Sequence, residues 1–248
     1  MPDDEMEAES RAADRLTLFS DAVVAIAITL LAIELPLPEG NTVPEFWASV
    51  RHESGAYAAF LISFVAIAAA WSDHHDIFRY VRRVDSRLRT LNFAWLLMIV
   101  LNPFATRLLT APGHPDLYTH ALRFSFYALL QVLESALTFA IVAHLVSRGL
   151  APRAPRGMAI GLARQSFNLI FGFGLSIPVF FVTPNAWIMW FAVPALVARF
   201  RYVRRRRRDR EAGRTRGPGD SAAGRHGPGG VGDPAGPGAD VEPGGDAS

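Results

Sequence analysis

The chain has 248 residues, 50% of them apolar, and contains no cysteine. The lack of cysteine excludes disulfides, thiolate catalysis and cysteine-ligated zinc. Every basic residue is an arginine, and the formal net charge of +2 hides a strong segregation of charge along the chain. Because a polar C-terminal tail dilutes a strongly apolar body, we expect an integral membrane protein.

The first apolar run, residues 16–35, carries Asp21 close to its start. Residues 1–10 are acidic and no small-residue cleavage site occurs before Pro36, so we expect a retained helix and not a secretory signal. A charge inside a membrane span is paired or functional. At about 100° per residue, Ile26, Leu30 and Ile33 form one stripe of a helix, and Asp21 lies about 140° from Ile26. We therefore expect Asp21 to face neighbouring helices while the stripe lines a pore or packs elsewhere.

Six apolar runs are long enough, or nearly so, to cross a hydrocarbon core of about 30 Å as helices of about 20 residues. They cover residues 16–35, 55–73, 88–109, 119–146, 158–182 and 185–202. The last two would make a single helix too long for the bilayer, so we expect a turn at residues 183–185. The predicted fold class is an all-α integral membrane protein with six transmembrane helices.

Arginines gather after the second, fourth and sixth predicted spans, at positions 79, 82, 83, 87, 89, 148, 153, 156, 201 and 204–208. Such segments are cytoplasmic by the positive-inside rule, which places both termini in the cytoplasm. The basic run 204–208 is interpreted as a stop segment that contacts membrane lipid, and not as a nucleic-acid site.

The predicted organisation has three regions. Residues 1–15 form a cytoplasmic N-terminal segment, and residues 16–203 form the six-helix transmembrane channel domain. Residues 204–248 form a basic and then Gly/Pro-rich tail. This tail has too few large apolar residues to fold, so we expect it to be disordered.

Polar side chains recur at the depth of Asp21 in the next two spans. They are His74 and His75 near the end of the second span, and Asn92 and Trp95 near the start of the third. We expect a hydrogen-bonded cluster, whose role is either transport or only the joining of helices.

Glu134 falls near the middle of the fourth span, where a lone carboxylate is costly. Arg164 and Asn168 on the fifth span are its predicted partners by depth. A structural ion pair or a protonated acid is favoured over a proton relay.

A specific motif opens the first span: Arg15, Phe19, Ser20 and Asp21 in the spacing R-x3-F-S-D, followed by Val23, Ala25, Ile26, Thr29, Leu30 and Leu31. It resembles the signature of the transmembrane protein 175 (TMEM175) family of potassium channels. The resemblance extends to Trp71, His74, His75, Asn92, Trp95 and residues 103–106. It covers the first three spans well and the later spans only by number and spacing.

The resemblance implies a homotetramer, because single-unit prokaryotic members assemble in this way, and an unconventional potassium-channel architecture in the bacterial inner membrane. The first helix of each subunit then lines the pore. Ile26 forms the hydrophobic constriction, Leu30 and Ile33 form further apolar layers, and Thr29 is the pore threonine. Rings of four aliphatic side chains close a narrow channel by excluding water.

The resemblance also implies a polar network that holds the first helix in register. It comprises Arg15, Phe19, Ser20 and Asp21 with Asn92, Trp95 and one or both of His74 and His75. At the other end of the helix, four copies of Glu34 would form an acidic outer mouth that concentrates cations, unless Glu34 lies in an ordinary solvated loop.

The predicted function is a modestly potassium-selective leak channel that needs no cofactor and no metal beyond permeant potassium. The alternative is a proton-conducting channel or secondary transporter that uses Asp21, His74, His75 and Glu134. An accessory membrane protein is a further alternative. We do not expect an enzyme, because the adjacent histidines do not match the i, i+4 spacing of a helical zinc site.

Overall fold

The computed structural model describes residues 2–113, 116–190 and 192. Their helices are α1 Pro2–Ile33, α2 Val43–His52, α3 Ser54–Phe78, α4 Ser86–Leu109, α5 Leu117–Arg148 and α6 Arg156–Phe180, followed by the 3₁₀ helix η1 Pro184–Ile188. This part of the chain contains no strand. Four helices, α1, α3, α4 and α5, are long and apolar enough to cross a membrane. The predicted all-α membrane class is confirmed.

The six-span count and the cytoplasmic termini remain predictions. Most of the predicted sixth span, residues 185–202, and all of the tail, residues 204–248, lie outside the described residues. Helix α1 runs without a break through the predicted N-terminal segment, residues 1–15, from Pro2 onward. This segment is rich in alanine, glutamate and arginine, which are good helix formers.

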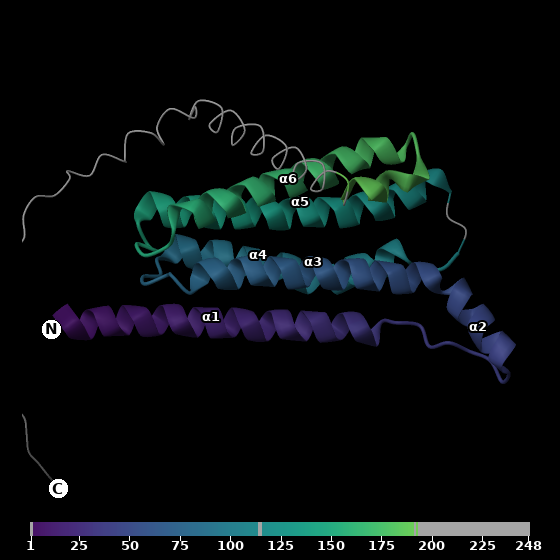
Figure 1. Ribbon diagram of the computed structural model, residues 1–248, viewed down its shortest axis with the longest axis horizontal. Coiled ribbons are helices and arrows are strands. Elements are labelled where there is room, and N and C mark those ends of the chain that lie inside the picture. Colours follow the sequence, from purple (N-terminus) through teal and green to yellow (C-terminus); the bar gives the residue numbers. More distant parts are fainter. Residues whose placement is uncertain (1, 114–115, 191, 193–248) are drawn as a thin grey trace, which may run out of the picture. The chain divides into compact units, whose positions relative to one another are not determined.

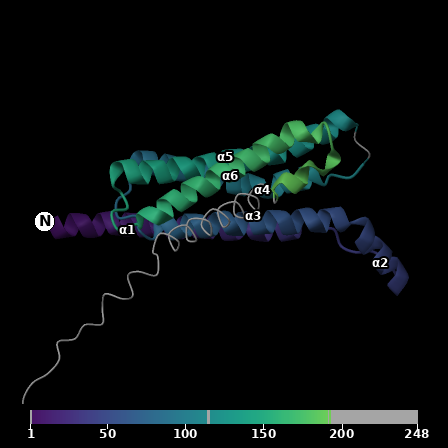
Figure 2. The same cartoon turned by 45° about the horizontal axis from the view of Figure 1, so that its top comes forward.

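Helix α1 lies along one side of the other long helices and packs against α3 and α4 (Figure 1). Helix α5 packs against α4 and α6, so α4 connects the two halves. A second view shows the same order, with α1 beside α3 and α6 crossing α5 (Figure 2). One apolar core joins α1, α3 and α4 to the C-terminal part of α5 and the N-terminal part of α6, and another joins α4, α5, α6 and η1.

Helix α2 occupies the segment that the sequence suggested was a loop. Thr42 begins it with a capping box, in which the Thr42 hydroxyl accepts from the Glu45 N–H and the Glu45 carboxylate accepts from the Thr42 N–H. Just before it, Gly40 has φ 138°, and a Cβ there would lie 2.6 Å from Phe46 N. Only glycine fits this turn.

The loops at the predicted cytoplasmic end are joined to one another. Asp85 caps α4 by accepting from Leu88 N–H at 2.7 Å, and the same carboxylate lies 2.8 Å from His144 Nε2 on α5. Arg82 N–H donates to the Leu150 carbonyl at 3.0 Å. The connection between α3 and α4 is therefore tied to the end of α5.

The chain reverses after α6, where the sequence predicts a turn. Thr183 caps η1 by accepting from Asn185 N–H at 3.3 Å. Trp190 Nε1 donates to Ser176 Oγ at 2.9 Å, and its ring stacks on Phe124 with 5.2 Å between centroids. The residues after the turn thus pack back against α5 and α6.

Asp85 gives a pH-dependent prediction. The Leu88 N–H, and after it His144, hold the pKa of Asp85 below its ordinary value of 3.8. The folded chain thus binds this proton less readily than the unfolded chain. The resulting stability is present above pH 3.8 and is lost as pH falls through the lower folded-state pKa. Asp85→Asn, which still caps a helix, should lower the thermal unfolding midpoint near neutral pH and reduce its further loss in acid.

The control is Asp14→Asn, because Asp14 is exposed on α1. It should leave both the midpoint and its acid dependence unchanged. Equal behaviour of the two variants would show that the Asp85 contact contributes nothing measurable.

Candidate functional site

Helix α1 has two faces of opposite character. Its packed face carries side chains that are no more than 2% exposed: Ser20, Val24, Ala27 and Leu31. Its other face carries Ile26, Leu30 and Ile33, which are 59%, 42% and 76% exposed. The aliphatic stripe that the sequence predicts therefore lies on the surface of the protomer, and we call it the bare face.

Thr29 belongs to the exposed side of α1 as well. Its hydroxyl donates to the Ile26 carbonyl at 2.8 Å. Because the proton is used within the helix, the oxygen lone pairs remain available to accept from water or to contact a cation.

A chain of hydrogen bonds attaches the packed face to α4 and α3. Asn92 Nδ2 donates to Ser20 Oγ at 2.9 Å, and Ser20 Oγ donates to the Leu16 carbonyl at 2.9 Å. Asn92 Oδ1 lies 2.7 Å from His74 Nε2. Since an amide oxygen only accepts, His74 donates from Nε2. Three of the predicted network residues, Ser20, Asn92 and His74, are thus brought together, each of them buried.

Stacking completes the environment of His74. Its ring lies between Phe78 and Trp95, at centroid distances of 3.9 and 4.3 Å. Trp95 is fully buried, and its Nε1 has no hydrogen-bond partner among the described residues. Trp95 therefore supports the network by packing and not by donating.

Asp21 belongs to a second polar group on the neighbouring side of α1. Trp71 Nε1 donates to Asp21 Oδ1 at 2.8 Å, and His75 Nδ1 lies 3.6 Å from Asp21 Oδ2. Successive residues of a helix point about 100° apart. His74 therefore donates to Asn92, while His75 approaches Asp21. The sequence left open which histidine joins Asp21, and it missed Trp71 as the direct donor.

Two other signature residues lie outside these groups. Arg15 is exposed, and no hydrogen bond or ion pair reaches it from the part of the protomer that the structure describes. Phe19 is half-exposed and meets Phe93 edge to face at 5.9 Å. Their place in the polar network remains a prediction.

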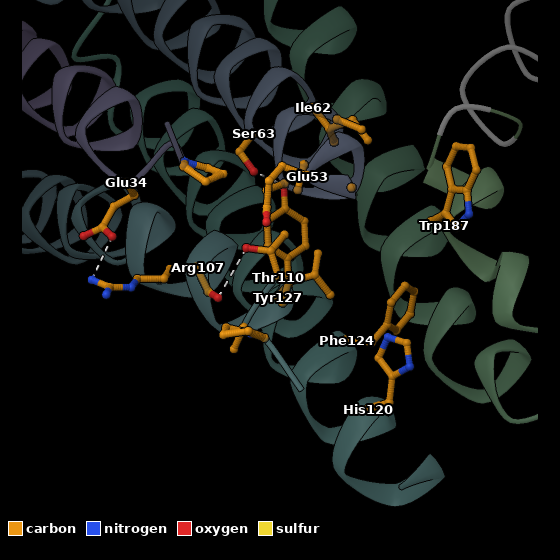
Figure 3. Close-up of a pocket in the computed structure, with 18 of the residues that line it drawn as sticks. Glu34, Glu53, Ile62, Ser63, Arg107, Thr110, His120, Phe124, Tyr127 and Trp187 are labelled. Carbon is orange, nitrogen blue, oxygen red and sulfur yellow. Dashed lines mark hydrogen bonds and ion pairs between the residues drawn. The ribbon is translucent and has the colours of Figure 1, made fainter. Parts of the chain in front are cut away.

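Glu34 at the far end of α1 is already paired. Its carboxylate lies 2.7 Å from Arg107 Nη1 on α4. The pair borders a cavity of about 960 Å³, with His120, Phe124 and Trp187 on the opposite side (Figure 3). An acidic mouth built from Glu34 would therefore be offset by an equal number of Arg107 charges.

Three polar contacts between helices were not predicted from the sequence. Thr106 Oγ1 lies 2.7 Å from Ser63 Oγ, which lies 3.1 Å from the Tyr127 hydroxyl, and Asn102 Nδ2 donates to Gln131 Oε1 at 2.8 Å. Small polar residues on otherwise apolar spans were the available signal. These contacts join α3, α4 and α5.

Glu134 is buried, at 7% exposed, and its carboxylate has no hydrogen-bond partner in the described part of the chain. Neither predicted partner, Arg164 or Asn168, bonds to it there. Arg164 is exposed. Glu134 instead lines a cavity together with Asp73.

Comparison with known proteins identifies the family. The sequence profile of endosomal/lysosomal potassium channel TMEM175 matches residues 15–103, which include both polar groups and the bare face. Residues 15–103 are similar to the TMEM175 family. Together with the apolar helices, this makes the chain a multi-pass protein of the cell membrane.

Individual TMEM175 relatives support this assignment. A potassium channel of Streptomyces collinus is 33% identical over 135 residues, which cover 54% of this chain and 65% of the relative. The chain thus spans less than two thirds of that relative's length. Human endosomal/lysosomal proton channel TMEM175 is 30% identical over 103 residues, covering 41% of this chain and 20% of the relative.

The fold agrees with that of a solved TMEM175 structure. The crystal structure of a lysosomal potassium-selective channel TMEM175 homolog from Chamaesiphon minutus superposes with a TM-score of 0.61 and 26% identity. The match covers 78% of this chain and 98% of that chain.

The Asn92 network gives a stability prediction. Asn92→Ala leaves the His74 Nε2–H and an acceptor site of Ser20 without their partner, at a cost of about 1–3 kcal/mol for each group left unpaired. The thermal unfolding midpoint of the purified protein should fall clearly. Asn41→Ala is the matched control, because Asn41 is exposed. Equal midpoints for the two variants would contradict the structural role of Asn92.

Proposed function

We propose that the chain is a modestly potassium-selective leak channel. Four subunits assemble around an axis, α1 of each lines the pore, and a ring of Ile26 side chains closes it. The observation that carries the proposal is the bare face of α1, which is exposed although the opposite face is held by buried polar bonds. Relatives of this chain from Streptomyces collinus and Chamaesiphon minutus are potassium channels.

The bare face has the chemistry of a gate and a weak filter. Rings of Ile26, Leu30 and Ile33 would exclude water from a narrow pore and so oppose ion passage. The Thr29 oxygens, free to accept, would replace part of the hydration shell of a potassium ion. Hydroxyls form a weaker filter than stacked backbone carbonyls, and the sequence has no Thr-Val-Gly-Tyr-Gly segment. Potassium selectivity is therefore modest.

Proton conduction is the second candidate. It is favoured by the contact between Asp21 and His75 beside the exposed side of α1, at 3.6 Å, and by the human relative, which is a proton channel. Aspartate and histidine side chains are typical members of proton relays within membranes. Potassium and proton flux are distinguished by measuring both in the same vesicles.

Flux through reconstituted protein tests the function. In potassium-loaded liposomes, the current should reverse near the potassium equilibrium potential. Ile26→Asn wets the proposed constriction, and lowering the barrier by about 1.4 kcal/mol raises flux about tenfold. Selectivity should weaken in the same variant.

Ala25→Asn is the matched control, because it adds the same amide about 100° around the exposed side of α1. It should conduct like the unmodified protein. Confirmed tetramers without current would overturn the channel proposal, and a current that follows only the pH gradient would favour proton conduction. Equal flux in both variants would remove Ile26 from the pore.

Accessibility along α1 tests the pore assignment independently. The chain has no cysteine, so single cysteines can be introduced at positions 22–34 and treated with a membrane-impermeant thiol reagent. We expect block at positions 26, 30 and 33, which lie on one stripe. We expect little effect at positions 24, 27 and 31, which are buried within the protomer.

Positions 25 and 32 are the controls for exposure alone, because they are exposed on the other edge of the same helix side. Block that is equal at positions 25, 26, 30 and 32 would show that the bare face does not form the pore wall.

A further inference from the structure

A largely apolar cavity of about 190 Å³ lies between α3, α5 and α6, and α1 contributes nothing to its described lining. It offers room for several molecules of water, each of which takes about 30 Å³ in the liquid. Its walls carry two carboxylates, Asp73 and Glu134, together with the amides of Gln131 and Gln165. The cavity is therefore separate from the bare face of α1.

Of the two carboxylates, only that of Asp73 accepts a hydrogen bond from a described residue. Gln165 Nε2 donates to Asp73 Oδ2 at 2.7 Å. Glu134 is more than nine-tenths buried, and no described residue donates to its carboxylate. Nearby polar groups are used otherwise, since the Thr138 hydroxyl donates to the Glu134 backbone carbonyl and Gln131 Oε1 accepts from Asn102.

Among the residues that the structure describes, no arginine or histidine lines this cavity. On α3, Asp76 adds negative charge beside Asp73 and pairs with Arg79 at 3.7 Å. On the same helix, His74 bonds to Asn92 and His75 approaches Asp21, and neither lines the cavity. On α6, Arg164 is exposed and lies outside the lining.

Two ionised carboxylates that face one largely apolar cavity, with no cation in its described lining, would repel each other and lose hydration. A single proton on the pair removes one charge and spares Glu134 an ionised carboxylate without a donor. We propose that Asp73 and Glu134 share a single proton, which makes this cavity a proton-binding site of the TMEM175 chain. The site does not depend on potassium conduction.

Carbodiimide labelling tests the site. Dicyclohexylcarbodiimide is apolar and reacts with protonated carboxyl groups, adding its mass to the modified residue. In vesicles of the full chain at neutral pH, mass spectrometry should find the adduct on Glu134. Raising the pH should remove it, because the shared proton is lost.

Two variants distinguish a proton shared by Asp73 and Glu134 from protonation of Glu134 that results from its burial alone. Asp73→Asn should reduce the labelling of Glu134 at neutral pH several-fold, because the carboxylate that holds the proton jointly is gone. Ser135→Ala is the matched control, because it changes the cavity lining without removing a carboxyl, and it should label normally. Unlabelled Glu134 in the unmodified chain, or equal labelling in both variants, would overturn the proposal.

The unmodified chain also tests which cation occupies the cavity. Labelling is repeated with saturating potassium or sodium at constant pH. Unchanged labelling supports a proton, whereas its disappearance would show that a metal cation occupies the site and would overturn the proposal. Labelling requires no ion current, so its result is independent of the flux measurements. The pH dependence in this chain keeps the proposal testable even when Asp73→Asn does not fold.

Discussion

Asn92 donates a hydrogen bond to Ser20 and accepts one from His74, and these two bonds decide how α1 is rotated against its neighbours. The apolar contacts of the same face, through Val24 and Ala27, would tolerate a small rotation, because dispersion contacts have little directionality. The buried hydroxyl of Ser20 and amide of Asn92 do not tolerate such a rotation, because leaving a polar group unpaired in an apolar environment is costly. A change of one residue would turn each side chain by about 100°. This contact therefore determines which side chains of α1 are left exposed.

The bare face and the polar layer are two consequences of the same rotation. With Ser20 directed at Asn92, Asp21 is brought to Trp71 and partly to His75, between α1 and α3. The carboxylate is thereby held by the protomer, while the aliphatic stripe is left for another surface. A helix with one face fixed by directional bonds and the other free is well suited to assembly, because its own subunit limits its movement.

Charged residues follow a consistent distribution in the described chain. Near the helix ends they form pairs that solvent can reach, such as Glu34 with Arg107. Pairs of this kind contribute little to stability. In the interior, Glu134 has no such partner and faces a cavity instead. The interior carboxylates are thus where the membrane environment, which penalises charge, has the strongest chemical consequence.

The sequence by itself determined the helical class, the first four long helices to within a few residues except at the start of α1, and the polar residues at the depth of Asp21 in the next two spans. It could do so because apolar length and charge placement are local properties. Its spacing also predicted that Ile26, Leu30 and Ile33 share one stripe of a helix, and left open whether that stripe lines a pore or packs. Only the tertiary structure decided that His74 bonds Asn92 while His75 approaches Asp21, that Arg107 pairs with Glu34, and that Glu134 meets a cavity shared with Asp73. Those partners lie on different helices, and no periodicity within one helix specifies the rotation of another.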